Sequence, residues 1–176
     1  MDTRNIQDKF RNWETDLIRD DLAQTASGFM AVFVNVDGDF NKASGVRNLN
    51  WFNGAATIMA GRKKWDTRGA VGTHHYKNVI HYPYEELADQ IAGWKTVGIR
   101  VIAAEIDNRA VPLTTYEWPE NVAVLFGEEN LGLSEEIMTL CDDIVFIPGR
   151  GSVRSLNVST TSGIFMYDYS MKRGLI

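Results

Sequence analysis

Residues 124–159 read VLFGEENLGLSEEIMTLCDDIVFIPGRGSVRSLNVS, and the ends of two apolar runs in this stretch decide the fold. The first run, VAVLF at 122–126, stops at Gly127, and the second, IVFI at 144–147, stops at Pro148. Short apolar runs bounded by Gly and Pro are typical of buried strands. We expect two strands that end beside each other and open into loops suited to holding a ligand.

The rest of the chain alternates between helical and strand patterns. Apolar residues at helical spacing predict an amphipathic first helix over 4–25, and further helices are predicted over 41–53, 84–98, from about Ser134, and over 157–172. Strands are predicted at 29–36, 56–61, 78–82, 99–105, 122–126 and 144–147. The stretch 61–77 is predicted to be a long loop of the kind that is often functional. The alternation indicates an α/β fold, a parallel sheet with helices on both faces, which binds ligands at the carboxyl ends of its strands.

Length and composition indicate one globular domain. The chain has 176 residues, of which 44% are hydrophobic, enough for one well-filled core. Its single cysteine, Cys141, excludes an intrachain disulfide and a Cys-rich metal site, and fits a reducing compartment. The longest apolar stretch, around FMAVFV, is too short to span a membrane, and the N-terminus lacks the features of a signal peptide. We expect a soluble, cytoplasmic protein without a metal or a membrane partner.

The charge is unevenly distributed along the chain. The net charge is -5, yet residues 41–77 contain seven basic residues and a single acid, Asp66. A basic segment on an acidic protein can steer a polyanion to one face. The alternative interpretation is an ordinary solvated basic loop, and charge alone does not separate the two.

Several common sites are excluded by their motifs. The segment after the first strand, DGDFNKASG, does not fit the dinucleotide-binding pattern G-x-G-x-x-G, and no Walker phosphate loop occurs. The three histidines lack the spacing and the nearby carboxylates of a zinc site. Because no G-x-S-x-G elbow is present, serine hydrolysis is also a poor interpretation.

Three strings together resemble a known family. FNKASGVR at 40–47, FGEENLGLS at 126–134 and IPGRGSVRSLNVSTTSGI at 147–164 resemble, in this order, the three motifs of the SpoU (TrmH-type) branch of the SPOUT superfamily. That family consists of RNA 2′-O-ribose methyltransferases that use S-adenosylmethionine. The resemblance covers residues 29–170 and implies an accessory helix over 1–26 and a methyltransferase domain over 27–176. It also implies a parallel α/β sheet with a deep C-terminal trefoil knot, which sequence rules alone disfavour.

The resemblance assigns the site residues one by one. It places Asn41, Arg47, Glu129, Ser155 and Asn157 at the catalytic positions of the family. Gly127, Ile147 and Leu156 match positions that line the cofactor pocket, and Ala103, Ala104 and Glu105 match the strand end that closes over the adenosine. The family mechanism makes Arg47 the proton acceptor, although a guanidinium is seldom neutral. Arg47 clamping a substrate phosphate, with the phosphate or water taking the proton, is the alternative.

The resemblance also suggests the substrate and the partners. GAVGTHHYKNVIHY at 69–82 is similar to the same stretch of tRNA guanosine-2′-O-methyltransferases, which favours tRNA, with a D-loop guanosine as the candidate nucleotide. The predicted RNA-binding residues are Arg62, Lys63, Lys64, Arg68 and His74. The short tail KRGLI departs from the Arg-rich tail of many tRNA enzymes and weakens the D-loop assignment. The family usually forms homodimers through the last helix, so we expect a homodimer.

Other interpretations remain open on the sequence. Asn41, Ser155 and Asn157 are residue types that cap helices, and Arg47 and Glu129 are common on surfaces. Gly127 and Gly132 fit turns with positive φ. At the level of function, the alternatives are an rRNA methyltransferase, a knotted RNA-binding dimer without catalysis, and a nucleotide-binding α/β enzyme outside the family.

Overall fold

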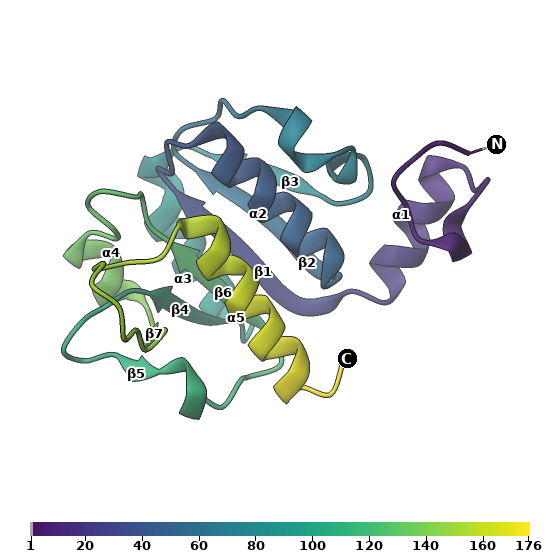
Figure 1. The fold of residues 1–176 in the computed structure, drawn as a ribbon. Helices are drawn as coiled ribbons and strands as arrows, with labels where there is room; N and C mark the ends of the chain where they lie inside the picture. The colour runs from purple at the N-terminus through teal and green to yellow at the C-terminus, as the bar shows by residue number, and fades with distance from the viewer. Residues whose placement is uncertain (1) are drawn as a thin grey trace.

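The computed structural model describes residues 2–176, and the strands within them form one parallel sheet. The strands are β1 (Ser27–Val34), β2 (Gly54–Ala60), β3 (Val79–Tyr82), β4 (Arg100–Ala104), β5 (Val111–Pro112), β6 (Val122–Phe126) and β7 (Asp143–Phe146). They lie in the order β3-β2-β1-β6-β4-β7-β5 (Figure 1). The prediction of a parallel α/β sheet is confirmed, and each of the six predicted strands is present.

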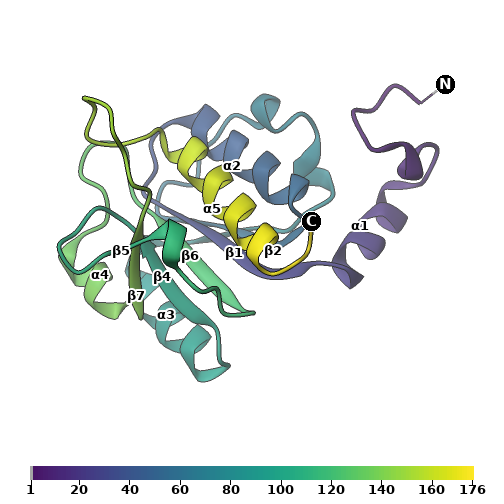
Figure 2. The ribbon, with the colours of Figure 1, turned by 60° about the horizontal axis from the view of Figure 1, so that its bottom comes forward.

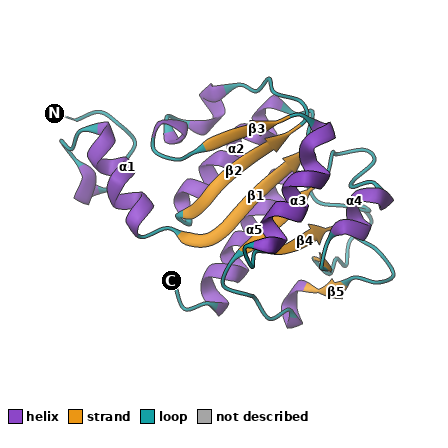
Figure 3. Ribbon diagram, turned by 180° about the vertical axis from the view of Figure 1, so that it is seen from behind, coloured by secondary structure: helices purple, strands orange, loops and turns teal. Residues whose placement is uncertain are grey.

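The helices cover both faces of this sheet. They are α1 (Thr15–Gln24), α2 (Asp39–Trp51), α3 (Leu87–Thr96), α4 (Glu135–Leu140) and α5 (Val158–Lys172). Helices α2 and α5 lie side by side on one face (Figures 1 and 2), and α3 and α4 lie on the other (Figure 3). The sheet is therefore shielded from water on both sides, as parallel sheets require.

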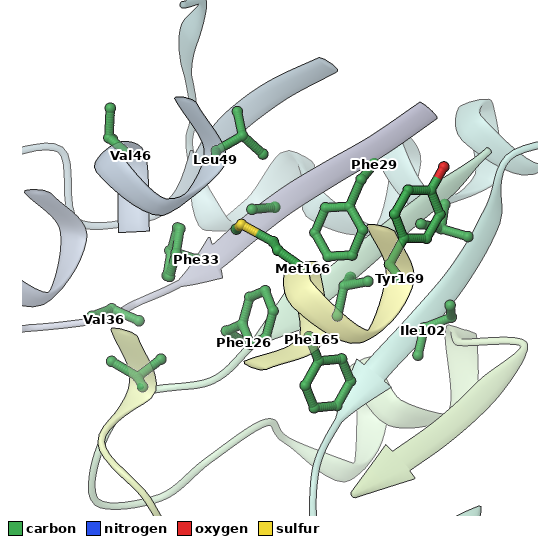
Figure 4. Packing of buried hydrophobic residues seen from close by; sticks show 14 of the residues in the cluster. Phe29, Phe33, Val36, Val46, Leu49, Ile102, Phe126, Phe165, Met166 and Tyr169 are labelled. Atoms are coloured by element: carbon green, nitrogen blue, oxygen red, sulfur yellow. The ribbon is translucent and has the colours of Figure 1, made fainter. Parts of the chain in front are cut away.

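Strand β1 shows why the apolar runs of this chain have no polar alternation. Phe29 and Phe33 point to the core beneath α2 and α5, where they pack with Phe126, Phe165 and other residues drawn in Figure 4. The alternate residues, Val32 and Val34, point to the opposite core beneath α3 and α4. Because successive side chains of a strand face opposite sides, both sets must be apolar when both faces are buried.

Two parts of the prediction need correction. The helix predicted over 4–25 is a short 3-10 helix at Asp8–Phe10 and then α1, with Asn12 at a positive φ of 64° between them. Strand β5 was not predicted, because two residues are too few to show a pattern. Its Pro112 fits an edge strand, which needs fewer backbone donors.

The loop at 61–77 is more ordered than its composition indicates. It contains two 3-10 helices, Thr67–Ala70 and Thr73–His75, and the Asp66 side chain accepts a hydrogen bond from the Arg68 backbone N–H at 3.0 Å. The N-terminal segment packs against the end of this loop, with Phe10, Ile18 and Tyr76 forming a small separate core. The segment otherwise lies to one side of the sheet (Figures 1 and 2).

The carboxyl ends of four neighbouring strands meet at one edge of the sheet. Phe126 of β6 is in register with Phe33 of β1 and with Ala104 of β4, and Ala104 is in register with Val145 of β7. The segments that follow these strands, beginning at 35, 105, 127 and 147, therefore emerge close together. In residues 2–176, no helix combines the length and apolarity that crossing a bilayer requires.

Candidate active site

Glu129 is the centre of a hydrogen-bond network at this edge. Its carboxylate accepts hydrogen bonds from Nδ2 of Asn41 at 2.5 Å and from the backbone N–H groups of Asp37 at 3.2 Å and Gly38 at 3.4 Å. Burial by itself would raise the pKa of Glu129, but these hydrogen bonds outweigh it and hold the pKa below its usual value. The carboxylate is therefore ionised at neutral pH and acts only as an acceptor.

Asn157 joins the third motif to the same network. Its Nδ2 donates to Oδ1 of Asn41 at 2.9 Å, so the amide of Asn41 is held from both sides. Its Oδ1 accepts from the backbone N–H groups of Ser159 at 3.0 Å and Thr160 at 3.3 Å, which caps α5. Capping and site geometry are thus combined in one side chain.

The capping interpretation of Asn41 is wrong. Helix α2 begins at Asp39 with Gly38 as its N-cap, so Asn41 lies inside the first turn and its amide is free for Glu129 and Asn157. Three segments that are far apart in the sequence are brought together by this one side chain. The network is the structural counterpart of the three sequence motifs.

Close backbone approach explains the glycine at position 127. A Cβ on Gly127 would lie 2.3 Å from the carbonyl carbon of Gly132, a separation that side chains do not tolerate. Gly132 itself has a positive φ of 67°, and a Cβ there would lie 2.2 Å from Oε2 of Glu105. The loop at 127–133 is therefore folded back on itself, and positive φ explains Gly132 but not Gly127.

Glu105, a predicted cofactor-binding residue, holds this loop in place. Its Oε2 accepts a hydrogen bond from the backbone N–H of Leu133 at 3.0 Å, and its Oε1 accepts from that of Ile106 at 3.0 Å. Ala103 is fully buried with its side chain in the core beneath α3 and α4, so only its backbone faces the edge, and Ala104 is partly buried. The β4 end thus supplies main-chain groups and one positioning carboxylate.

Apolar side chains are uncovered around these loops. Ile106 follows β4, Leu131 follows β6, and Val153 and Leu156 follow β7, and all four are exposed. Ile147 is half-buried against the core. A cluster of loops that presents both backbone polar groups and apolar side chains suits a ligand with an apolar ring and polar edges.

Two predicted catalytic residues lie outside the network. Arg47 is on α2, roughly 9 Å along the helix axis from Asn41, and it is exposed with no hydrogen bond or ion pair to the described residues. Ser155 is exposed in the loop at 147–157 and likewise has no partner within residues 2–176. Both side chains are free to meet a molecule that arrives from solution.

Several predicted RNA-binding residues are already engaged within the protein. Arg62 forms an ion pair with Asp37, and Arg68 pairs with Asp66 at 2.5 Å. His74 packs edge-on against Trp65, and burial together with His75 lowers its pKa. Lys63 and Lys64 are exposed and have no carboxylate partner in the described part of the chain. The basic surface is smaller than the charge count indicates.

Lys42 was counted with that basic segment, yet it is 2% exposed. Its Nζ donates to the backbone carbonyls of Arg62 at 3.0 Å and Lys64 at 2.8 Å. A lysine next to Asn41 in a polar helix gave no signal of burial, because the carbonyls it bonds are 20 and 22 residues away. Within residues 2–176, no three His, Cys, Asp or Glu side chains gather as a metal site.

The comparison with known families decides the family of this chain. Residues 28–167 match the model of the SpoU rRNA methylase family, and these residues contain the whole network. The chain belongs to this family. Its members are RNA 2′-O-methyltransferases, and the prediction of this enzyme class is confirmed.

Individual relatives of this SpoU-family chain differ in their named substrates. An uncharacterized tRNA/rRNA methyltransferase of Archaeoglobus fulgidus is 29% identical, and the match covers 86% of the chain and 68% of that protein. The tRNA (guanosine(18)-2′-O)-methyltransferase of Escherichia coli is 29% identical, with 51% of the chain and 39% of the relative covered. The 23S rRNA (guanosine-2′-O-)-methyltransferase RlmB of Acinetobacter baylyi is 35% identical over 43% of the chain and 30% of its own length.

Solved structures share the fold of this chain. The TrmH/SpoU tRNA modifying enzyme of A. aeolicus superposes with a TM-score of 0.82 at 21% identity, covering 92% of the chain and 83% of that structure. The SpoU methyltransferase AviRb of Streptomyces viridochromogenes, in complex with the cofactor AdoMet, has a TM-score of 0.73 at 23% identity, with 87% and 61% covered.

Proposed function

We propose that this SpoU-family chain transfers the methyl group of S-adenosylmethionine to a ribose 2′-hydroxyl of a tRNA. The network of Glu129, Asn41 and Asn157 carries the proposal, because it joins the three motifs in one place at the carboxyl ends of the strands. A residue that served only the core would not need a partly exposed amide that is held from two sides. A polar group that is fixed and still accessible is what a substrate-orienting site requires.

The residues around the strand ends fit S-adenosylmethionine. Gly127, Ile147 and Leu156 would line its site together with the backbone of Ala103 and Ala104, while Glu105 keeps the 127–133 loop in position. The exposed apolar side chains and the backbone polar groups there match an adenine ring with its polar edges. When bound, the cofactor supplies an electrophilic methyl group on a sulfonium.

The protein must orient the hydroxyl and provide for its proton. Asn41, fixed between Glu129 and Asn157, is placed to hold the ribose by its amide. Arg47 is exposed and has no partner in residues 2–176, which suits a guanidinium that grips a substrate phosphate in two hydrogen bonds, with the phosphate or water taking the proton. Ser155, exposed in the loop at 147–157 and without a partner among the described residues, would contact the substrate.

The 61–77 loop is the proposed RNA-binding surface. Lys63 and Lys64, which pair with no carboxylate of residues 2–176, offer charges for phosphates, and Arg62, Arg68 and His74 lie in the same loop. The Arg62–Asp37 ion pair links this loop to the network, since the Asp37 backbone N–H also donates to Glu129. tRNA is favoured over rRNA by the resemblance of residues 69–82 and by the E. coli relative named for tRNA guanosine 18.

A homodimer is proposed on the outer side of α2 and α5. Trp51, Tyr167 and Met171 are exposed on these adjoining helices, and Phe52 packs edge-on against Tyr167 with ring centroids 6.3 Å apart. Trp51 is 71% exposed. A patch of large apolar residues on neighbouring helices is suited to burial against a second copy.

A trefoil knot is proposed from the family resemblance and from the contacts of α5 with the connection between β5 and β6. This connection contacts the C-terminal half of α5, with Lys172 Nζ donating to the Leu113 carbonyl at 2.6 Å and Trp118 Nε1 to Asp168 at 2.7 Å. Tyr169 donates to the Glu120 carbonyl at 2.6 Å. Helix α5 thus contacts the connection between β5 and β6 and also packs against α2. This arrangement fits a C-terminal segment that is threaded beneath that connection.

The division at residue 26 and the compartment are proposals as well. The segment before β1 has its own small core of Phe10 and Ile18 with Tyr76, which fits an accessory element attached to a methyltransferase domain of residues 27–176. A cytoplasmic location fits the single cysteine, Cys141, whose thiol has its pKa raised by burial to about 12 and is inert as a nucleophile.

Methyl transfer from radiolabelled S-adenosylmethionine to total RNA, followed by mapping of the modified nucleotide, tests the function. We expect label in tRNA at a ribose, with a D-loop guanosine as the first candidate. Label in rRNA would instead support the alternative function, an rRNA methyltransferase. Cofactor binding without transfer to any RNA would favour a non-catalytic RNA-binding dimer. Absence of S-adenosylmethionine binding would contradict the proposed methyltransferase activity.

A further inference from the structure

Lys42 is a buried cation without a buried anion beside it. It is 2% exposed, and no carboxylate of residues 2–176 lies within ion-pair distance of its Nζ. Burial lowers its pKa, although Asp39 and Asp37 act in the opposite direction. Lysine is almost never fully buried unless its ammonium is satisfied by partners. Its position therefore needs a reason in the structure around it.

The partners of Lys42 are two carbonyls of the RNA-facing loop. Nζ donates to the carbonyl of Arg62 at 3.0 Å and to that of Lys64 at 2.8 Å. The side chains of residues 62–64 are all exposed. The carbonyls of residues 62 and 64 therefore face Lys42 while the charged side chains face the solvent. The neighbouring residue, Asn41, is bonded to Glu129 and Asn157. Consecutive residues of α2 thus connect the catalytic network and the loop.

We propose that Lys42 is a positioning residue that fixes the basic loop at 62–64 for RNA binding, in register with the catalytic network. This rests on the proposed RNA methyltransferase function. A compact ammonium with three donors on a flexible stem can bond two carbonyls at once, which a planar guanidinium of larger size does less well in a closed space. Without it, two carbonyls lose their donor and the loop loses its ordered conformation.

The loop itself reports on this role, because trypsin cleaves after each of residues 62–64. Limited proteolysis of the full chain should show cleavage there several-fold faster in Lys42→Met than in the wild type, since a freed loop adopts the extended form a protease needs. Cleavage after Arg150 and Arg154, in the exposed loop at 147–157, is the internal reference and should not change. Lys95→Met, at an exposed ion pair on α3 with Asp142, is the matched control.

The kinetic expectation separates RNA positioning from a general loss of structure. Lys42→Met should raise the KM for RNA about tenfold while the dissociation constant for S-adenosylmethionine stays within about twofold. Unchanged cleavage at 62–64 would overturn the proposal, and so would faster cleavage with an unchanged KM for RNA. If Lys42→Met does not fold, Lys42→Leu, which also lacks a donor for the two carbonyls, is judged by the same two criteria. A wild type without RNA methylation would refute the proposed function, while proteolysis still reports on the loop.

Discussion

Asn41 and Glu129 are 88 residues apart in the chain, and Nδ2 of Asn41 lies 2.5 Å from Oε1 of Glu129. The same carboxylate accepts two backbone N–H groups from residues 37 and 38. Because an ionised carboxylate offers only acceptors, it fixes which way the Asn41 amide points. The oxygen of that amide is consequently directed to the donor of Asn157.

Glu129→Gln should lower kcat by about 100-fold, because an amide brings its own N–H donors to a place that needs an acceptor and misaligns Asn41. Affinity for S-adenosylmethionine should change little. Steady-state methylation of RNA and cofactor titration measure the two effects. Glu128→Gln is the control, since Glu128 makes no side-chain hydrogen bond to the described residues. A kcat within a few-fold of the wild type would contradict the role of the network.

Asn157→Asp and Asn157→Ala separate capping from catalysis. Aspartate caps helices as well as asparagine does, so the free energy of unfolding of Asn157→Asp should lie within about 0.5 kcal/mol of the wild-type value. That of Asn157→Ala should be lower by about 1 kcal/mol. Both lose the donor to Asn41, and both should lower kcat by about 100-fold. Denaturant unfolding and methylation assays provide the data. A fully active Asn157→Asp variant would show that the amide acts only as a cap.

Arg47→Ala should abolish methyl transfer while leaving cofactor affinity near that of the wild type, because its side chain is exposed and has no partner in the described part of the chain. Arg47→Lys should recover little activity, since an ammonium cannot grip a phosphate with a planar fork. Single-turnover methylation with a saturating cofactor concentration checks this. Activity of Arg47→Ala close to the wild-type level would refute both roles considered for Arg47.

Gly127→Ala should weaken S-adenosylmethionine binding at least about tenfold, because a Cβ would collide with the backbone of Gly132 and displace the loop. Isothermal titration measures the affinity. Gly93→Ala is the matched control: a Cβ at this position in α3 meets nothing within 4 Å, and alanine favours a helix. Equal cofactor affinity of the two variants would show that the loop at 127–133 does not line the site.

Lys77 is expected to make stability depend on pH. Burial lowers its pKa from 10.5 to about 8, and the side chain is 7% exposed. Between these values the unfolded chain binds more protons, so the free energy of unfolding should rise with pH from 8 to 10.5, by about 1–3 kcal/mol. In Lys77→Met this rise should be absent, and the variant should be more stable than the wild type at pH 7. Denaturant unfolding at several pH values tests this, with the exposed Lys64→Met as the control. An identical pH dependence in both variants would contradict it.

Local sequence patterns predicted most helices and strands, because the pattern of each element involves residues that are close together in the sequence. The apolar runs of β1 and β6 required burial on both faces, and the Asn157 cap follows from a residue type that favours helix starts. The N-cap at Gly38 was less predictable, because glycine has no side chain to give a signal and Asn41 was a better candidate by type. The 3-10 helices of the 61–77 loop are too short to leave a periodicity.

The sequence by itself determined the alternation of strands and helices, and its three motifs indicated the SpoU family. Only the tertiary structure decided how the charged and polar residues are used. It buried Lys42 beneath the basic loop, paired Arg62 with Asp37, left Arg47 free and aligned Asn41 between Glu129 and Asn157. The physical reason is range: strand and helix patterns arise within a few residues, whereas these contacts join segments brought together by the parallel order of the strands.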